Sequence, residues 1–122
     1  LSIDANALER LEETALQGKV LVSAVSAWEI GLLARPARSS SLSFLPDAQA
    51  WFQDYLQQHG VRVLPLSWET AIASPFFPLP LHHDPADRLL IATARALDVP
   101  LMTRDRVLLD DAAQGHMQAI EC

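Results

Sequence analysis

Short apolar segments alternate with longer segments of helical periodicity along the whole chain. The apolar segments have the length and continuity typical of strands in a parallel sheet. They are Val20–Ser23, Val61–Leu64, Leu101–Thr103 and Met117–Glu121. Strands that alternate with helices predict an α/β fold, specifically a three-layer α/β/α sandwich around a short parallel sheet.

The longer segments carry the start and stop signals of helices. They run from Ser2 to Gly18, from Ser26 to Pro36, from Pro46 to Gly60, from Ser67 for a few residues, from Asp84 to Leu97, and from Val107 to Gly115. Two segments rich in Ser, Pro or Arg, residues 35–43 and 74–80, are expected to be connections between these elements.

Apolar stripes at helical spacing are expected to form the core. They comprise Leu8, Leu11 and Ala15 in the first helix, Trp51 and Tyr55 in the third, and Leu89, Leu90, Thr93 and Leu97 in the fifth. A platform for stacking bases is the alternative reading of the two aromatic residues, but helical spacing alone explains them.

The composition describes one ordinary globular domain, residues 1–122, with 50% hydrophobic and 20% charged residues. The formal net charge of −6 excludes a general basic surface for nucleic acids. Cys122 is the only cysteine, which rules out an intrachain disulfide and fits a reducing cytoplasm. No apolar run approaches the length of a membrane span.

Three acidic residues are expected to meet at the carboxyl edge of the sheet, where ligands bind in parallel α/β folds. Asp87 lies in the first turn of a helix that begins at Asp84 and Pro85, and Asp105 follows the strand Leu101–Thr103. Glu29 lies early in the helix that follows Val20–Ser23, so it belongs to the same edge.

Each acid also has a structural explanation of its own. Ser26 and Glu29 have the spacing of a capping box, Asp87 favours the positive end of a helix dipole, and Asp105 suits a turn. The joint placement of all three on one edge favours a common site. Converging carboxylates need a cation, and an all-oxygen ligand set favours Mg²⁺ or Mn²⁺. His82 and His83 are nearby but are expected to be exposed to solvent.

Three stretches of the chain resemble PIN-domain proteins, in particular the VapC-like toxins of bacterial toxin–antitoxin pairs. The stretches are Val22–Ile30 (VSAVSAWEI), Asp84–Ala94 (DPADRLLIATA) and Leu101–Asp105 (LMTRD). Their order and spacing match as well, and the likeness extends over nearly the whole chain.

The resemblance implies a Mg²⁺-dependent endoribonuclease that is usually a homodimer and is held inactive by a cognate antitoxin protein. Carried over by position, Glu29, Asp87 and Asp105 are the catalytic acids that bind the metal. Thr103 supplies a hydroxyl that orients the site, and Asp84 is an accessory acid. Three arginines near these acids are candidates for binding RNA phosphates. They are Arg88, Arg104 and Arg106.

One departure from the family pattern affects the function. The family begins with a strand whose terminal Asp supplies the first acid of the site, whereas this chain opens at the following helix. We expect an N-terminal segment to be missing, in preference to Asp4 serving as that acid. A degenerate PIN domain that binds a protein or RNA without cutting is therefore the alternative function. A phosphoacceptor receiver domain is disfavoured, because Lys19 is the only lysine and lies outside the C-terminal half.

Overall fold

The computed structural model describes residues 5–35, 44–76 and 84–122. The chain divides into two compact units. The N-terminal unit comprises Leu11–Pro65, and the C-terminal unit comprises Leu66–Cys122 together with Leu1–Arg10. The predictions that concern Ser2, Asp4, Pro36, His82 and His83 fall on residues outside the described ones.

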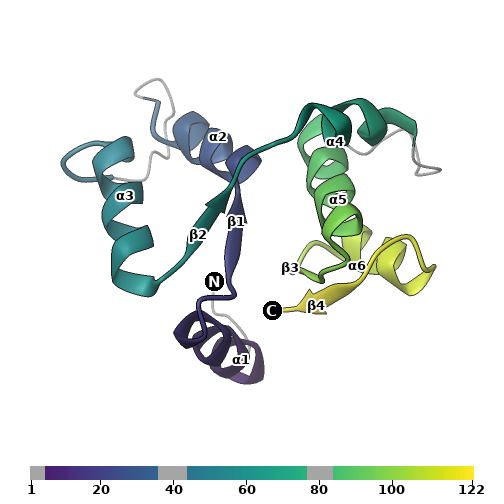
Figure 1. Ribbon diagram of the computed structural model, residues 1–122, viewed down its shortest axis with the longest axis horizontal. Helices are drawn as coiled ribbons and strands as arrows, with labels where there is room; N and C mark the ends of the chain where they lie inside the picture. Colours follow the sequence, from purple (N-terminus) through teal and green to yellow (C-terminus); the bar gives the residue numbers. More distant parts are fainter. Residues whose placement is uncertain (1–4, 36–43, 77–83) are drawn as a thin grey trace. The chain divides into compact units, whose positions relative to one another are not determined.

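The N-terminal unit contains a two-stranded parallel sheet with helices in the connections (Figure 1). Its elements are β1 (Leu21–Ser23), α2 (Ala24–Leu33), α3 (Ala48–His59) and β2 (Arg62–Leu64), preceded by α1 (Ala5–Leu16), which begins in the other unit. Val22 of β1 pairs with Val63 of β2 in parallel register. The strand and helix segments predicted here are therefore confirmed, apart from their exact ends.

Side-chain caps explain where the helices of this unit begin and end. The Ser23 hydroxyl accepts a hydrogen bond from the Val25 N–H at 3.0 Å, so α2 begins directly after β1, before the predicted start at Ser26. Asp47 caps α3 in the same way, and Gly60, with φ of 63°, ends that helix in the left-handed conformation that glycine favours.

The C-terminal unit repeats the alternation of helix and strand (Figure 1). Its elements are α4 (Trp68–Ala73), the short 3₁₀ helix η1 (Ser74–Phe76), α5 (Pro85–Leu97), β3 (Leu101–Thr103), α6 (Arg106–Ala113) and β4 (Ala119–Glu121). Met102 of β3 pairs with Ile120 of β4, again in parallel, with α6 as the crossover between the two strands. Asp98, with φ of 53°, ends α5 where the sequence predicts a break.

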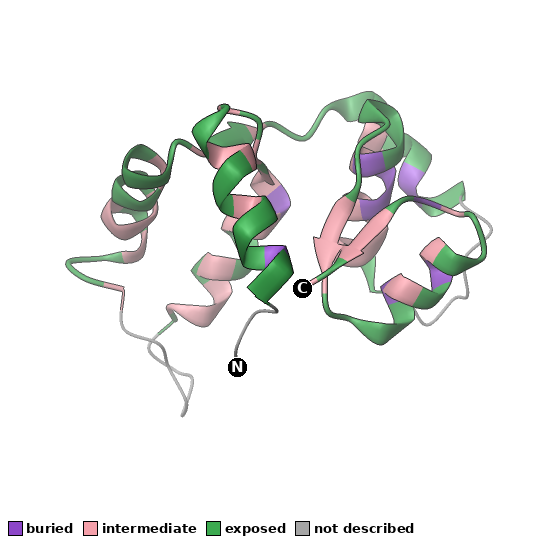
Figure 2. Ribbon diagram, turned by 90° about the horizontal axis from the view of Figure 1, so that it is seen from below, coloured by how far each residue is buried: buried purple, intermediate pink, exposed green. Residues whose placement is uncertain are grey.

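Buried side chains of the C-terminal unit lie mainly on α5, on α6 and in the segment before β4, and Ala7 of α1 and Val25 of α2 are buried as well (Figure 2). Ile91 is 0% exposed and packs in one cluster with Leu108 and Met117. The predicted stripe on α5 is therefore wrong in part, because Leu97 is 43% exposed. The helix turns its Ile91 face inward, where residues from two later segments cover it.

Two other predicted core faces are also wrong in part. In α1, Ala7 is buried while Leu8 is 40% exposed. No described side chain of α3 is buried, so Trp51 and Tyr55 do not form a closed core. Instead their rings stack on each other with centroids 5.6 Å apart, and Phe44 meets the Trp51 ring edge-on at 4.8 Å.

The observed elements give an α/β fold with short parallel strands. The described strands pair as β1 with β2 and β3 with β4. The three-layer sandwich that the sequence predicts stays a prediction. None of the described helices has the length and apolar character needed to cross a membrane.

Candidate functional site

The loop after β3 holds two of the predicted site residues in a defined local geometry. The backbone N–H of Asp105 donates to Oγ1 of Thr103 at 3.1 Å. Oδ1 of Asp105 in turn accepts from the N–H of Val107 at 2.8 Å, which makes Asp105 the N-cap of α6. The Asp105 side chain is exposed and has a second carboxylate oxygen with which to bind a cation.

The start of α5 places the next two predicted acids. Asp84 is the N-cap, and its Oδ1 accepts from the N–H of Asp87 at 2.7 Å. Asp87 is half-buried in the first turn, where the helix dipole favours a negative charge. Asp84 therefore has a structural task that accounts for its position, and the capping bond involves the backbone N–H of Asp87.

Glu121 is an acid that the sequence analysis missed. It ends β4 and pairs with Thr103 across the sheet, so it lies at the same carboxyl edge as Asp105. The prediction of a strand ending at Glu121 contained the necessary signal, because acids at the ends of neighbouring parallel strands share an edge.

The three predicted phosphate-binding arginines have different surroundings. Nη2 of Arg106 contacts Oε1 of Glu121 at 3.2 Å, and both side chains are more than half exposed. Arg104 is exposed, while Arg88 is half-buried and has its Nη1 atom shielded from solvent. Arg104 and Arg106 are therefore more accessible to solvent than Arg88.

Glu29 belongs to the N-terminal unit, on the exposed side of α2. The cap of this helix is Ser23, so a capping box between Ser26 and Glu29 does not exist at the helix start. That structural explanation for Glu29 is wrong. The carboxylate faces solvent, and the structure gives it no task in forming the helix.

Carboxylate oxygens at a sheet edge suit a hard divalent cation. Within the described residues, however, no group of three or more His, Cys, Asp or Glu side chains is arranged to hold a metal ion. Asp105 and Glu121 lie at one strand edge and Asp87 lies on α5, in the unit that does not contain Glu29.

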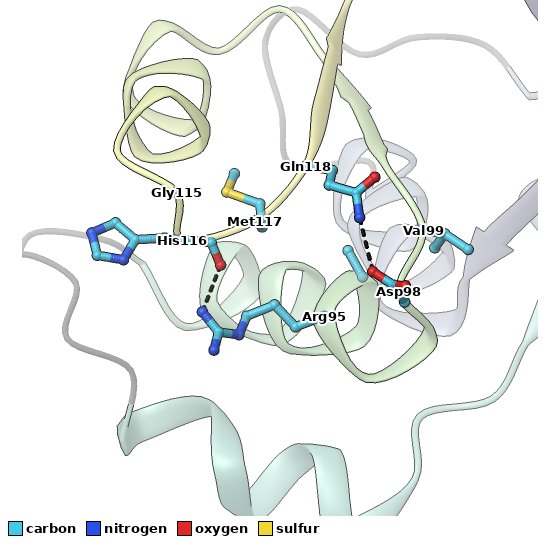
Figure 3. Close-up of a pocket in the computed structure, with 8 residues that line it drawn as sticks. Arg95, Asp98, Val99, Gly115, His116, Met117 and Gln118 are labelled. Atoms are coloured by element: carbon cyan, nitrogen blue, oxygen red, sulfur yellow. Dashed lines mark hydrogen bonds between the residues drawn. The ribbon is translucent and has the colours of Figure 1, made fainter.

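A polar pocket of about 390 Å³ lies at the other end of α5 (Figure 3). Two hydrogen bonds close its sides: Arg95 donates to the carbonyl of His116 at 2.6 Å, and Gln118 donates to Oδ1 of Asp98 at 2.8 Å. Asp98 ends α5, whereas Asp84 begins it. This pocket is therefore separate from the predicted acids, and its own polar groups largely satisfy one another.

Comparison with known families supplies the remaining information on identity. The model of the PIN domain matches residues 2–114. The chain belongs to the PIN-domain family. No curated protein and no solved structure gives a significant match to it. PIN domains are typically nucleases.

Proposed function

We propose that this PIN domain is a metal-dependent endoribonuclease. The observation that carries the proposal is the family match together with the exposed carboxylate of Asp105, directly after β3. Asp87 and Glu29 complete the acid set by resemblance to the VapC-like pattern. Bound Mg²⁺ or Mn²⁺ supplies an activated water and shields charge on the scissile phosphate.

The residues of the chain have three tasks in this proposal. Asp87, Asp105 and Glu29 bind the cation. The Thr103 hydroxyl fixes the turn that presents Asp105, through the bond to its N–H. Exposed Arg104 and Arg106 attract the RNA backbone, which the net charge of −6 otherwise repels.

A non-catalytic PIN domain that binds a protein or RNA is the second candidate. One observation favours it: the described residues contain no ready-made cluster of three metal-binding side chains. A domain with this geometry and no further acid is expected to retain partner binding and to cut RNA slowly or not at all.

The biological setting that we propose is a cytoplasmic toxin of a bacterial toxin–antitoxin pair. An acidic cleft is most simply silenced by a basic peptide, so the antitoxin is expected to place an Arg or Lys among the acids. Binding of such a peptide should weaken as salt rises. Salt-independent binding would instead indicate an apolar groove distant from Asp87 and Asp105.

We further propose that both units belong to one domain with the three-layer sandwich of the family. In the fold that the sequence resembles, an additional strand ending in Asp pairs with both the β1 and the β3 segments. The family match over residues 2–114, which span both units, supports one domain.

Cleavage and metal binding are tested together. A single-stranded RNA of mixed sequence is incubated with the chain in Mg²⁺, in Mn²⁺ and in EDTA, and the melting temperature is measured under the same conditions. Metal should raise the melting temperature because a ligand bound only by the folded state stabilises it. Asp87→Asn should remove most of that rise and the cleavage while leaving the fold intact.

The outcomes separate the two functions. Metal-dependent cleavage that Asp87→Asn abolishes supports the nuclease. RNA or protein binding without cleavage, and without any metal effect on melting, supports the binding module.

A further inference from the structure

Helix α2 carries an aromatic ring, a glycine and a cation along one strip of its exposed surface. Trp28 is 60% exposed, and Gly31 and Arg35 are exposed as well. They follow one another at spacings of three and four residues, which places them on the same side of a helix. We call these three residues the α2 row.

The helical path continues to the last member of the row. Arg35 follows the C-cap Ala34, and its N–H donates to the Leu32 carbonyl at 3.4 Å. At 1.5 Å per residue, Trp28 and Arg35 are about 10 Å apart along the axis. The long arginine side chain bridges much of that distance, so the indole and the guanidinium can contact one ligand of the size of a nucleotide.

Gly31 keeps the surface between the ring and the cation open. A Cβ built on Gly31 would meet no atom within 4 Å, so internal packing does not require a glycine here. Glycine weakens a helix interior, and Gly31 lies inside α2. The missing side chain lets a ligand approach the backbone between Trp28 and Arg35.

The α2 row lies beside an acid of the proposed active site. Glu29 follows Trp28 directly and is also exposed. It is the α2 acid that the family resemblance assigns to the cation. A group bound on Trp28 is therefore a neighbour of the position where the scissile phosphate has to lie.

A single exposed tryptophan is common and needs no explanation by itself. Trp28 differs because a cation and a proposed catalytic acid accompany it on the same helix. An indole offers a face on which any base stacks, and a guanidinium pairs with phosphate. The combination matches one nucleotide of a single strand, and the positive charge of Arg35 complements the RNA backbone.

We propose that Trp28 stacks on a base of single-stranded RNA while Arg35 binds a phosphate next to that base. This inference rests on the proposed function, because the RNA is the substrate of the site to which Glu29 is assigned. Trp28 then selects unpaired RNA, since a base inside a duplex has no free face for the indole.

The first test measures RNA binding by fluorescence anisotropy in EDTA, with a single-stranded RNA of mixed sequence and the 122-residue chain. Trp28→Ala should raise the Kd about 5- to 150-fold, the range that one stacked base contributes. Trp28→Phe keeps an aromatic face and should restore most of the affinity. Trp68→Ala is the matched control, because Trp68 is 71% exposed and lies outside the row.

The second test observes Trp28 directly. Trp51→Phe together with Trp68→Phe leaves Trp28 as the only tryptophan of the chain. Acrylamide should quench its fluorescence in the free protein, and single-stranded RNA should quench it in a saturable way and shield it from acrylamide. Arg35→Gln should weaken RNA binding and reduce the slope of log Kd against log salt by about one.

The third test examines whether the bound nucleotide lies beside Glu29. Without a cation the Glu29 carboxylate repels phosphate, so Glu29→Gln should tighten RNA binding several-fold in EDTA. Glu9→Gln removes the same charge from α1 and should leave the Kd unchanged. Circular dichroism and melting temperature establish that each variant folds.

The outcomes separate this inference from the proposed nuclease. RNA binding that Trp28→Ala leaves intact, or a Trp28 that acrylamide does not reach because another part of the chain covers it, overturns the inference while metal-dependent cleavage can still stand. RNA binding that depends on Trp28 without any cleavage supports the inference and overturns the nuclease. A parent chain that binds no RNA overturns both.

Discussion

The Asp105 N–H donates to the Thr103 hydroxyl at 3.1 Å, and this bond links the end of β3 to the start of α6. It holds the turn so that the Asp105 carboxylate caps α6 at the sheet edge. The family resemblance implies that Thr103 orients the site, and this role stays a prediction. For Asp105, the structure shows the helix cap and the proposed function adds a cation ligand, and substitutions can separate these two roles.

The first prediction separates two roles of the Asp105 carboxylate, as the cap of α6 and as a ligand of the cation. Asn caps helices about as well as Asp, so Asp105→Asn should change the free energy of unfolding by only a few tenths of a kcal/mol. Asp105→Ala removes the cap and should cost about 1 kcal/mol. Both variants should lose metal-dependent RNA cleavage, because both lack the carboxylate. Urea unfolding and a cleavage assay make the two measurements.

Asp84 is the matched control for this experiment, since its carboxylate also caps a helix. It accepts from the N–H three residues on, whereas Asp105 accepts from the N–H two residues on. Asp84→Ala should lose about as much stability as Asp105→Ala. Asp84→Asn should keep both stability and cleavage if Asp84 is only a cap. Loss of cleavage in Asp84→Asn would instead assign Asp84 the accessory role that the family resemblance implies.

The second prediction concerns the contact between Arg106 and Glu121. Glu121 competes with RNA for the guanidinium, so Glu121→Gln should tighten RNA binding. Arg106→Gln should weaken binding and reduce the slope of log Kd against log salt by about one. The pair is exposed, so neither change should alter the unfolding free energy by more than about 1 kcal/mol. Binding is measured by fluorescence anisotropy in EDTA, which prevents cleavage.

If Glu121→Gln leaves RNA binding unchanged while Arg106→Gln weakens it, Glu121 does not compete for the arginine. If neither variant changes RNA binding, Arg106 is not a phosphate-binding residue.

The third prediction tests which face of α5 stabilises the C-terminal unit. Ile91 is fully buried against Leu108 and Met117, so Ile91→Ala should cost about 2–5 kcal/mol. Leu97→Ala removes a side chain that is 43% exposed and should cost much less. If both variants lose a comparable free energy of unfolding, Leu97 belongs to the core, as the sequence predicts. Denaturant unfolding of both variants decides between the two faces.

Local chemistry accounts for what the sequence predicts well. Asp84, Asp47 and Gly60 mark helix ends correctly because capping involves only residues within one turn. The strand order along the chain follows from short apolar runs. The α/β class and the acids at strand and helix ends are therefore accessible without a structure.

The errors arise where distant segments decide the result. Helix α5 offers two nearly equivalent apolar faces, and Leu108 and Met117 select the one that contains Ile91. Glu121 became a site candidate only when its pairing with Thr103 was known. The sequence also does not predict that Trp68, Ile72 and Phe76 are exposed. A periodic pattern identifies an apolar face of a helix without showing whether that face is turned to the core or to solvent.

The last prediction concerns the open edges of the two sheets. In the part of the chain that the structure describes, β1 pairs with β2 and β3 pairs with β4, and neither β1 nor β3 has a second partner strand. Strand edges that remain unpaired expose backbone groups, and each hydrogen bond made to them contributes about 0.5–1.5 kcal/mol.

Extending the chain before Leu1 with a strand that ends in Asp should therefore raise the melting temperature. It should also increase metal-dependent RNA cleavage, because the family resemblance assigns that Asp to the site. The same extension ending in Asn should retain the gain in stability but lose the gain in cleavage. An extension that changes neither property would contradict the proposed strand. Full activity of the 122-residue chain, abolished by Asp4→Asn, would show instead that Asp4 is the first acid.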